Sequence, residues 1–97
     1  MNKAVNKLKE ILCNSWYNDN VILSISRNLF TTTGISISGF DCEIDDESIS
    51  IIDDNNQNII IPIEDITDIE FFNEDYEDTI TIMLKDDLEI ILTKIMV

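Results

Sequence analysis

The chain has 97 residues, of which 44% are hydrophobic, and its 20 acidic against 6 basic residues give a formal net charge of −14. This length corresponds to one domain, residues 1–97, and the apolar fraction suffices for a small packed core, which excludes wholesale disorder. The charge argues against direct binding to nucleic acid, and no apolar run approaches the roughly 18 residues of a membrane span.

The cysteines and the first residues predict a cytoplasmic protein. Cys13 and Cys42 have neither the number nor the spacing of a disulfide framework or a zinc site, and the chain contains no His. Lys7, Lys9 and Glu10 interrupt the apolar positions of a signal peptide. We therefore expect reduced thiols, no cofactor and no metal.

The first element expected is a helix over about residues 3–13. Val5, Leu8 and Leu12 are three and four positions apart, which places one apolar stripe along the helix and turns its lysines away. We expect this stripe to pack on the core, with Trp16 and Tyr17 closing over it. If the stripe were left uncovered, it would also allow a homodimer.

Strands are expected over about residues 20–95, beginning where the apolar period changes to two at Val21 and Leu23. The alternation slips by one residue at Gly39, which predicts a bulge or sharp bend, because a slip turns every later side chain to the other face. Pro62 cannot donate a ladder hydrogen bond and is expected at a sheet edge or with its nitrogen facing outward. Asn and Asp build the turns expected at 18–20 and 53–56.

The second half of the chain is expected to end in a hairpin. Ile63, Ile66 and Ile69 are spaced by threes, which indicates a short helical turn or a crossover before a strand at 70–72. The polar segment NEDYED, residues 73–78, is expected to separate that strand from the next one at 79–84. A tight turn at 85–87 then leads into the return strand.

One N-terminal helix followed by about six antiparallel strands defines an α+β domain, in which a strongly bent sheet or small barrel carries the helix over one open end. This order of elements resembles the Sm-like and SH3-like small barrels. The segment IPIEDITDIE looks like the corresponding link of bacterial pleckstrin-homology-like domains. Both resemblances concern the fold, and no functional residues are carried over from them.

The residue types argue against an enzyme. Without His, the usual general base near neutral pH is missing, so that a Ser or Cys nucleophile would need another activator. Cys13 is expected at the negative end of the helix dipole, and Cys42 is surrounded in sequence by Asp41, Glu43 and Asp45, all of which oppose thiolate formation. We expect both cysteines to be packing residues.

A calcium loop is also not expected. Asp53, Asn55 and Gln57 occupy the first, third and fifth positions of a twelve-residue EF-hand frame, and Glu64 occupies the twelfth. Asn58 stands at the sixth position, where the loop requires Gly, and no helices flank the segment.

The acidic residues are concentrated in one half of the chain, since residues 41–89 contain eighteen of them against Lys85 alone. A small domain needs a net charge of only about two to eight for solubility, so the excess favours a basic partner. Carboxylates two apart on a strand share a face and lie roughly 6.6 Å apart, close to successive phosphates of one nucleic-acid strand. The candidate partner-binding residues are the acidic Asp41, Glu43, Asp45, Asp68, Glu70, Glu74, Asp75, Glu77 and Asp78, with Phe71, Phe72 and Tyr76 as apolar anchors.

A small acidic domain of this kind resembles the phage-encoded inhibitors of host defence nucleases, anti-CRISPR proteins and DNA mimics, in size, charge and architecture. The resemblance implies an inhibitor that occupies the basic nucleic-acid-binding surface of a nuclease or another nucleic-acid-processing protein. One alternative is a generic interaction module, an immunity protein or adaptor subunit with an acidic solvated face. Another is an enzyme or small-ligand binder.

Overall fold

The N-terminal stripe forms a helix in the structure, a computed structural model that describes residues 2–27, 30–31, 34–55, 58–74 and 77–95. Helix α1 spans Asn2–Glu10 and continues as a π-helical turn, η1, over Ile11–Ser15. Leu8 and Leu12 are fully buried and Trp16 follows them into the core, as the spacing predicts. The prediction for Tyr17 is wrong, because its side chain is 61% exposed. Neither α1 nor any other described helical segment is long and apolar enough to cross a membrane.

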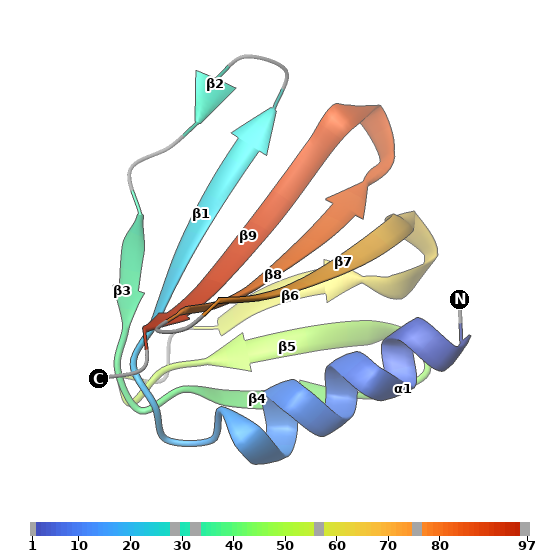
Figure 1. Cartoon of the computed structure of the whole chain (residues 1–97). Helices are drawn as coiled ribbons and strands as arrows, with labels where there is room; N and C mark the ends of the chain where they lie inside the picture. The colour runs from blue at the N-terminus through green and yellow to red at the C-terminus, as the bar shows by residue number, and fades with distance from the viewer. Residues whose placement is uncertain (1, 28–29, 32–33, 56–57, 75–76, 96–97) are drawn as a thin grey trace.

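Two antiparallel sheets make up the rest of the described chain (Figure 1). The large sheet has the order β2-β1-β9-β8-β7, with β3 also paired to β1. Its strands are β1 Val21–Arg27, β2 Phe30–Thr31, β3 Ile35–Ile37, β7 Ile66–Glu74, β8 Glu77–Leu84 and β9 Leu88–Ile95. The small sheet has the order β4-β5-β6, and its strands are β4 Asp41–Ile44, β5 Ser48–Ile52 and β6 Asn58–Pro62.

The chain crosses between the two sheets at Gly39 and again at the 3-10 turn η2, Ile63–Asp65. Gly39 has φ +62, a left-handed conformation that a side chain would disfavour, so the predicted sharp bend is confirmed. The phase slip has a simple cause, since β3 and β4 on either side of Gly39 belong to different sheets. The second crossing confirms the helical turn expected from the isoleucine spacing. Pro62 ends the edge strand β6, also as predicted.

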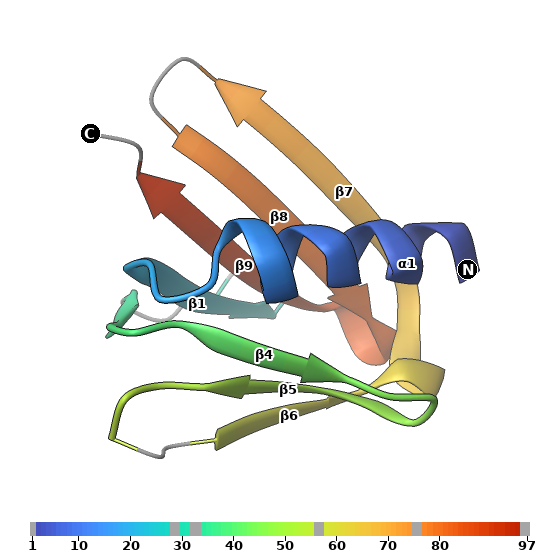
Figure 2. The same cartoon turned by 90° about the horizontal axis from the view of Figure 1, so that it is seen from below.

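The core lies between the inner faces of the two sheets, and the helix closes one side of it (Figure 2). The Cys13 thiol donates a hydrogen bond to the carbonyl of Cys42 on β4, at 2.9 Å. On the other side of the helix, the Lys7 ammonium lies 4.4 Å from the centroid of the Phe71 ring on β7. The helix therefore contacts the edge strands of both sheets. The core consists of Leu8, Leu12, Trp16, Val21, Leu23, Ile37, Phe40, Cys42, Ile49, Ile51, Ile61, Ile66, Ile69, Ile80, Ile82, Leu84, Ile90 and Leu92.

Three further expectations can be compared with this architecture. The α+β class with an N-terminal helix and antiparallel strands is confirmed, whereas a closed barrel is not, because no described strand pairing joins the two sheets. The strand expected at 70–72 already begins at Ile66 and runs through Glu74. Only residues 75–76 separate β7 from β8, so NEDYED is mainly strand rather than a loop.

Candidate functional site

The acidic residues of β7 lie on the side of the large sheet that faces away from the core. Ile69 is buried and Phe71 half-buried on the inner side, while Asp68, Glu70 and Phe72 are exposed on the other. An irregularity in register between Ile66 and Asp68 precedes this alternation. The prediction that Asp68 and Glu70 share one face is confirmed.

Cross-strand pairing continues this outer surface over β8, β9 and β1. Glu70 pairs with Thr81, which pairs with Ile91, which pairs with Ser24. The helix and the small sheet pack on the opposite side, so the outer side has no cover within the described residues (Figures 1 and 2). We call this surface the open face, and it consists of Asp68, Glu70, Phe72, Thr79, Thr81, Met83, Glu89, Ile91, Thr93, Ile22, Ser24 and Ser26.

The open face carries three carboxylates, those of Asp68, Glu70 and Glu89, and no basic side chain. Glu89 was not among the sequence candidates. Met83 pairs with Asp68 on one side and with Glu89 on the other, which puts the backbones of these two acidic residues two strand spacings apart, roughly 9.6 Å. The alternation of Glu89 with Leu88 and Ile90 could have identified it, but only with the strand order known.

In the second acidic row, on β4, two carboxylates accept hydrogen bonds from backbone N–H groups that are close in sequence. Asp41 and Glu43 alternate with the buried Cys42 and share an outward side, as predicted. The Asp41 carboxylate accepts a hydrogen bond from the Cys42 N–H at 2.8 Å. Asp45 lies past the strand end, where its Oδ1 accepts hydrogen bonds from the backbone N–H groups of Glu47 and Ser48, both at 2.8 Å. These two donors lower the pKa of Asp45, which acts as a turn former.

The candidates at the β7–β8 connection separate into different positions. Asp78 lies on the inner side of β8, where its carboxylate accepts a hydrogen bond from the Asn73 side-chain amide. It is therefore not part of the outward row with Asp68 and Glu70. Asp75 and Tyr76 lie outside the described residues, and the side chains of Glu74 and Glu77 are not described either.

The two acidic rows do not form one continuous field, because the basic helix lies between their strands. Lys3, Lys7 and Lys9 on α1 are exposed. Lys9 lines a hollow together with Asp45 and Asp46, next to the β4 row. The structure thus brings positive charge to the β4 side, whereas the open face of the large sheet has none.

Most of the other described acidic residues lie in turns. The last of these turns, η3, spans Lys85–Asp87 and has Asp86 and Asp87 in left-handed conformations, which confirms the predicted tight turn. Two ion pairs are found among the described side chains, Lys94 with Asp19 at 2.9 Å and Lys85 with Asp65 at 3.6 Å. The acidic turn residues are Asp45, Asp46, Glu47, Asp53, Asp54, Glu64, Asp65, Asp86 and Asp87.

The thiols are in packing positions. Cys42 is buried, and Cys13, half-buried, donates to its carbonyl. Burial raises the pKa of both thiols, and the nearby Asp41 and Glu43 add to this effect. The thiolate form needed for nucleophilic attack is therefore disfavoured at both positions.

The two ends of the EF-hand frame, Asp53 and Glu64, are far apart. Asp53 uses its Oδ1 to accept the Asn55 N–H at 2.9 Å, and Gln57 lies outside the described residues. Glu64 lies past the other end of β6 from Asp53, a strand length of roughly 16 Å. Within the described residues, no group of three or more His, Cys, Asp or Glu side chains is arranged to hold a metal ion.

Comparison with protein-family models, with curated proteins and with solved structures finds no match to this chain.

Proposed function

We propose that the protein is a binding inhibitor whose open face covers the basic nucleic-acid-binding surface of a nuclease or another nucleic-acid-processing protein. The partner is a basic protein, and the protein itself makes no contact with nucleic acid. Asp68, Glu70 and Glu89 pair with its lysines and arginines, and Phe72 is the apolar anchor among them.

The observation that carries the proposal is the charge of the open face, which holds three carboxylates and no basic side chain. A sheet holds these groups on a rigid backbone, so that little conformational entropy is lost when they bind. Phe72 is 60% exposed beside the half-buried Phe71 and its half-buried cross-strand partner Thr79, an arrangement typical of an anchor side chain at an interface.

A second function is favoured by the centre of the same face. Thr81, Ile91 and Ser24 form a neutral row across it, and nine of the 20 acidic residues lie in described turns, where they serve solubility and turn formation. Such a face suits a generic interaction module, an immunity protein or adaptor subunit, whose contacts are mainly apolar and hydrogen-bonded.

Charge reversal separates the two functions. The purified protein is immobilised and used to isolate its partner from a cell extract, and affinity is then measured with the purified partner. If the protein is the proposed inhibitor, Asp68→Lys combined with Glu70→Lys is expected to abolish binding to the basic partner. The matched control, Asp46→Lys combined with Glu47→Lys, makes the same change in net charge at the exposed β4–β5 turn and is expected to keep most of the affinity.

Salt and competition complete the test. Binding through exposed charge pairs should weaken steeply between low and physiological salt, because charges are screened over about 8–10 Å. Duplex DNA or RNA should displace the protein from its partner. Binding that is indifferent to salt, that survives reversal of Asp68 and Glu70, and that coexists with bound nucleic acid would exclude the inhibitor and support the interaction module.

A further inference from the structure

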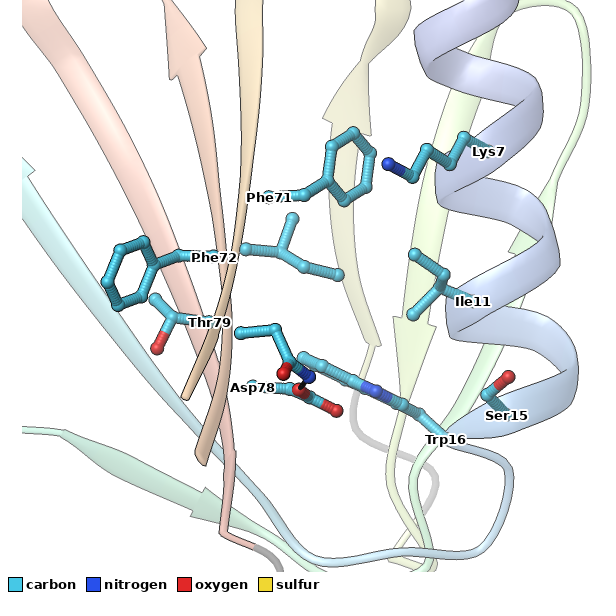
Figure 3. Close-up of a pocket in the computed structure, with 10 residues that line it drawn as sticks. Lys7, Ile11, Ser15, Trp16, Phe71, Phe72, Asp78 and Thr79 are labelled. Carbon is cyan, nitrogen blue, oxygen red and sulfur yellow. Dashed lines mark hydrogen bonds between the residues drawn. The ribbon is translucent and has the colours of Figure 1, made fainter. Parts of the chain in front are cut away.

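A hollow of about 350 Å³ opens between the helical segment and the inner side of β7 and β8 (Figure 3). Ile11 and Trp16 line it from the helical side, and Phe71 and Ile80 line it from the sheet. The ring of Phe71 points toward the helix, while that of Phe72 points away from it (Figure 3). The remaining lining residues are Lys7, Ser15, Asn73, Asp78 and Thr79.

The π-helical turn shapes this hollow. The Trp16 N–H donates a hydrogen bond to the carbonyl of Ile11 at 3.0 Å. This bond joins residues five positions apart, whereas α-helical bonds join residues four apart, so the helix is wider here. Trp16 is held in place by an edge-on contact with Phe40, at 6.1 Å between ring centroids, and is buried. Turns of this kind occur often at functional sites. The result is a fixed aromatic wall.

An acidic group lies at the strand end of the hollow. The Asn73 amide donates to Oδ1 of Asp78, which orients the carboxylate. A carboxylate has a second oxygen that accepts hydrogen bonds, and the Asn73 amide keeps its carbonyl oxygen as another acceptor. Neither ion pair between described side chains involves Asp78. Lys7, the basic residue that lines the hollow, lies over the Phe71 ring.

We propose that this hollow is a pocket for the guanidinium side chain of one arginine of the basic partner, an inference that rests on the proposed function. The guanidinium pairs with Asp78 and the Asn73 carbonyl, since its planar fork of donors matches two neighbouring acceptors. The aliphatic stem lies along Ile11 and Ile80, next to the buried Trp16 side chain that lines the same hollow.

Other ligand types fit the pocket less well. An anionic group would be repelled by the Asp78 carboxylate, and the Lys7 ammonium that could attract it lies over the Phe71 ring. A purely apolar group would bury Asp78 and Asn73 without replacing their hydrogen bonds to water. A lysine ammonium offers a point charge in place of the planar fork and uses the paired acceptors less completely.

The pocket can be tested without the partner. The full chain is titrated with N-acetyl-arginine amide, and the indole N–H of Trp16, the single Trp of the chain, is followed by NMR. A saturable shift of this signal is expected. N-acetyl-citrulline amide has the same shape without the charge and is expected to bind about tenfold more weakly or worse, because charge-assisted hydrogen bonds are lost.

Two variants locate the effect. Asp78→Asn keeps the size of the side chain and removes the charge, and it is expected to weaken binding of N-acetyl-arginine amide about tenfold. Asp46→Asn makes the same change at the exposed β4–β5 turn and is expected to leave this binding unchanged. The comparison of arginine and citrulline on the unaltered protein holds even if Asp78→Asn fails to fold.

A titration in which the Trp16 signal does not move, or moves equally with citrulline, overturns the pocket. So does an equal loss in Asp46→Asn and Asp78→Asn. The outcome is separable from the proposed function: if reversal of Asp68 and Glu70 abolishes partner binding while Asp78→Asn retains full affinity, the pocket is refuted and the inhibitor stands. If arginine binds at Trp16 but nucleic acid does not compete for the partner, the pocket stands and the inhibitor is refuted.

Discussion

Strands β4 and β7 look alike in sequence and differ in their surroundings. Both are edge strands with carboxylates two positions apart, Asp41 and Glu43 on one and Asp68 and Glu70 on the other. The β4 row ends in Asp45, which is bonded into a turn and shares a hollow with Lys9. The β7 row instead continues across the sheet to Glu89 without a basic neighbour. Equal spacing thus predicts a shared face, but the neighbouring elements determine its charge.

The largest effect on stability is expected from weakening the packing of the helix that lies between the two acidic rows. Leu12→Ala should lower the free energy of unfolding by about 2–5 kcal/mol, because Leu12 is fully buried and its truncation leaves a cavity. Denaturant unfolding measures the change. Lys3→Ala on the exposed side of the same helix should stay within about 0.5 kcal/mol. An unchanged midpoint for Leu12→Ala would show that the helix does not hold the edge strands together.

Charge reversal on the two strands compares the rows directly. Asp68→Lys with Glu70→Lys should weaken binding to the basic partner about tenfold more than Asp41→Lys with Glu43→Lys, because only the β7 row faces a surface free of positive charge. Affinity measured at physiological salt decides the comparison. Equal losses would mean that the partner senses net charge alone, and a larger loss on β4 would move the binding surface to the small sheet.

A smaller effect is expected for the pH dependence of stability at Asp45. The Glu47 and Ser48 N–H groups hold its pKa below the usual value near 3.9, so the ionised form stabilises the turn. This contribution is complete above that value and is lost as the pH falls through the lowered pKa of the folded protein. The difference in unfolding midpoint between the unaltered protein and Asp45→Asn should therefore be constant near neutral pH and shrink below about pH 4. A difference that persists at the lowest pH would rule out the charge as its source.

The smallest effect is expected from calcium. Millimolar Ca²⁺ should shift the thermal midpoint no more than Mg²⁺ does, because Asp53 and Glu64 lie at opposite ends of β6 and the remaining acidic groups screen both ions alike. A shift selective for Ca²⁺ that disappears in Asp53→Ala would reveal a calcium site after all.

The elements with strong local signals could be predicted from sequence. The spacing of Val5, Leu8 and Leu12 indicates the helix, Gly39 marks the bend, and the residues 85–87 mark the last turn. The expectation of about six strands is too low, because the segments on either side of Gly39 form two strands, β3 and β4, of different sheets, and β2 has only two residues. The polar residues at 73, 74, 77 and 78 suggest a loop, whereas cross-strand pairing extends β7 and β8 through them.

The candidate site was harder to predict because it depends on strand order. Asp78 belongs to the acidic cluster in sequence, yet it lies on the inner side of the sheet, toward the helix. Glu89 is distant in sequence from Asp68, yet Met83 lies between them on the same face. Neither relation is encoded in local spacing, since both arise from pairings between separate segments.

The pairing of β1 with β9 has a consequence for how the chain folds. It joins Val21 to Lys94, so that the centre of the large sheet closes only after the intervening segments are in place. The small sheet, in contrast, consists of three consecutive strands with short connections and has little entropy to lose on closure. We expect β4–β6 to order early and the large sheet to set the slow step. Nascent chains without β9 would then leave one edge of β1 unpaired, and such an edge is prone to aggregation.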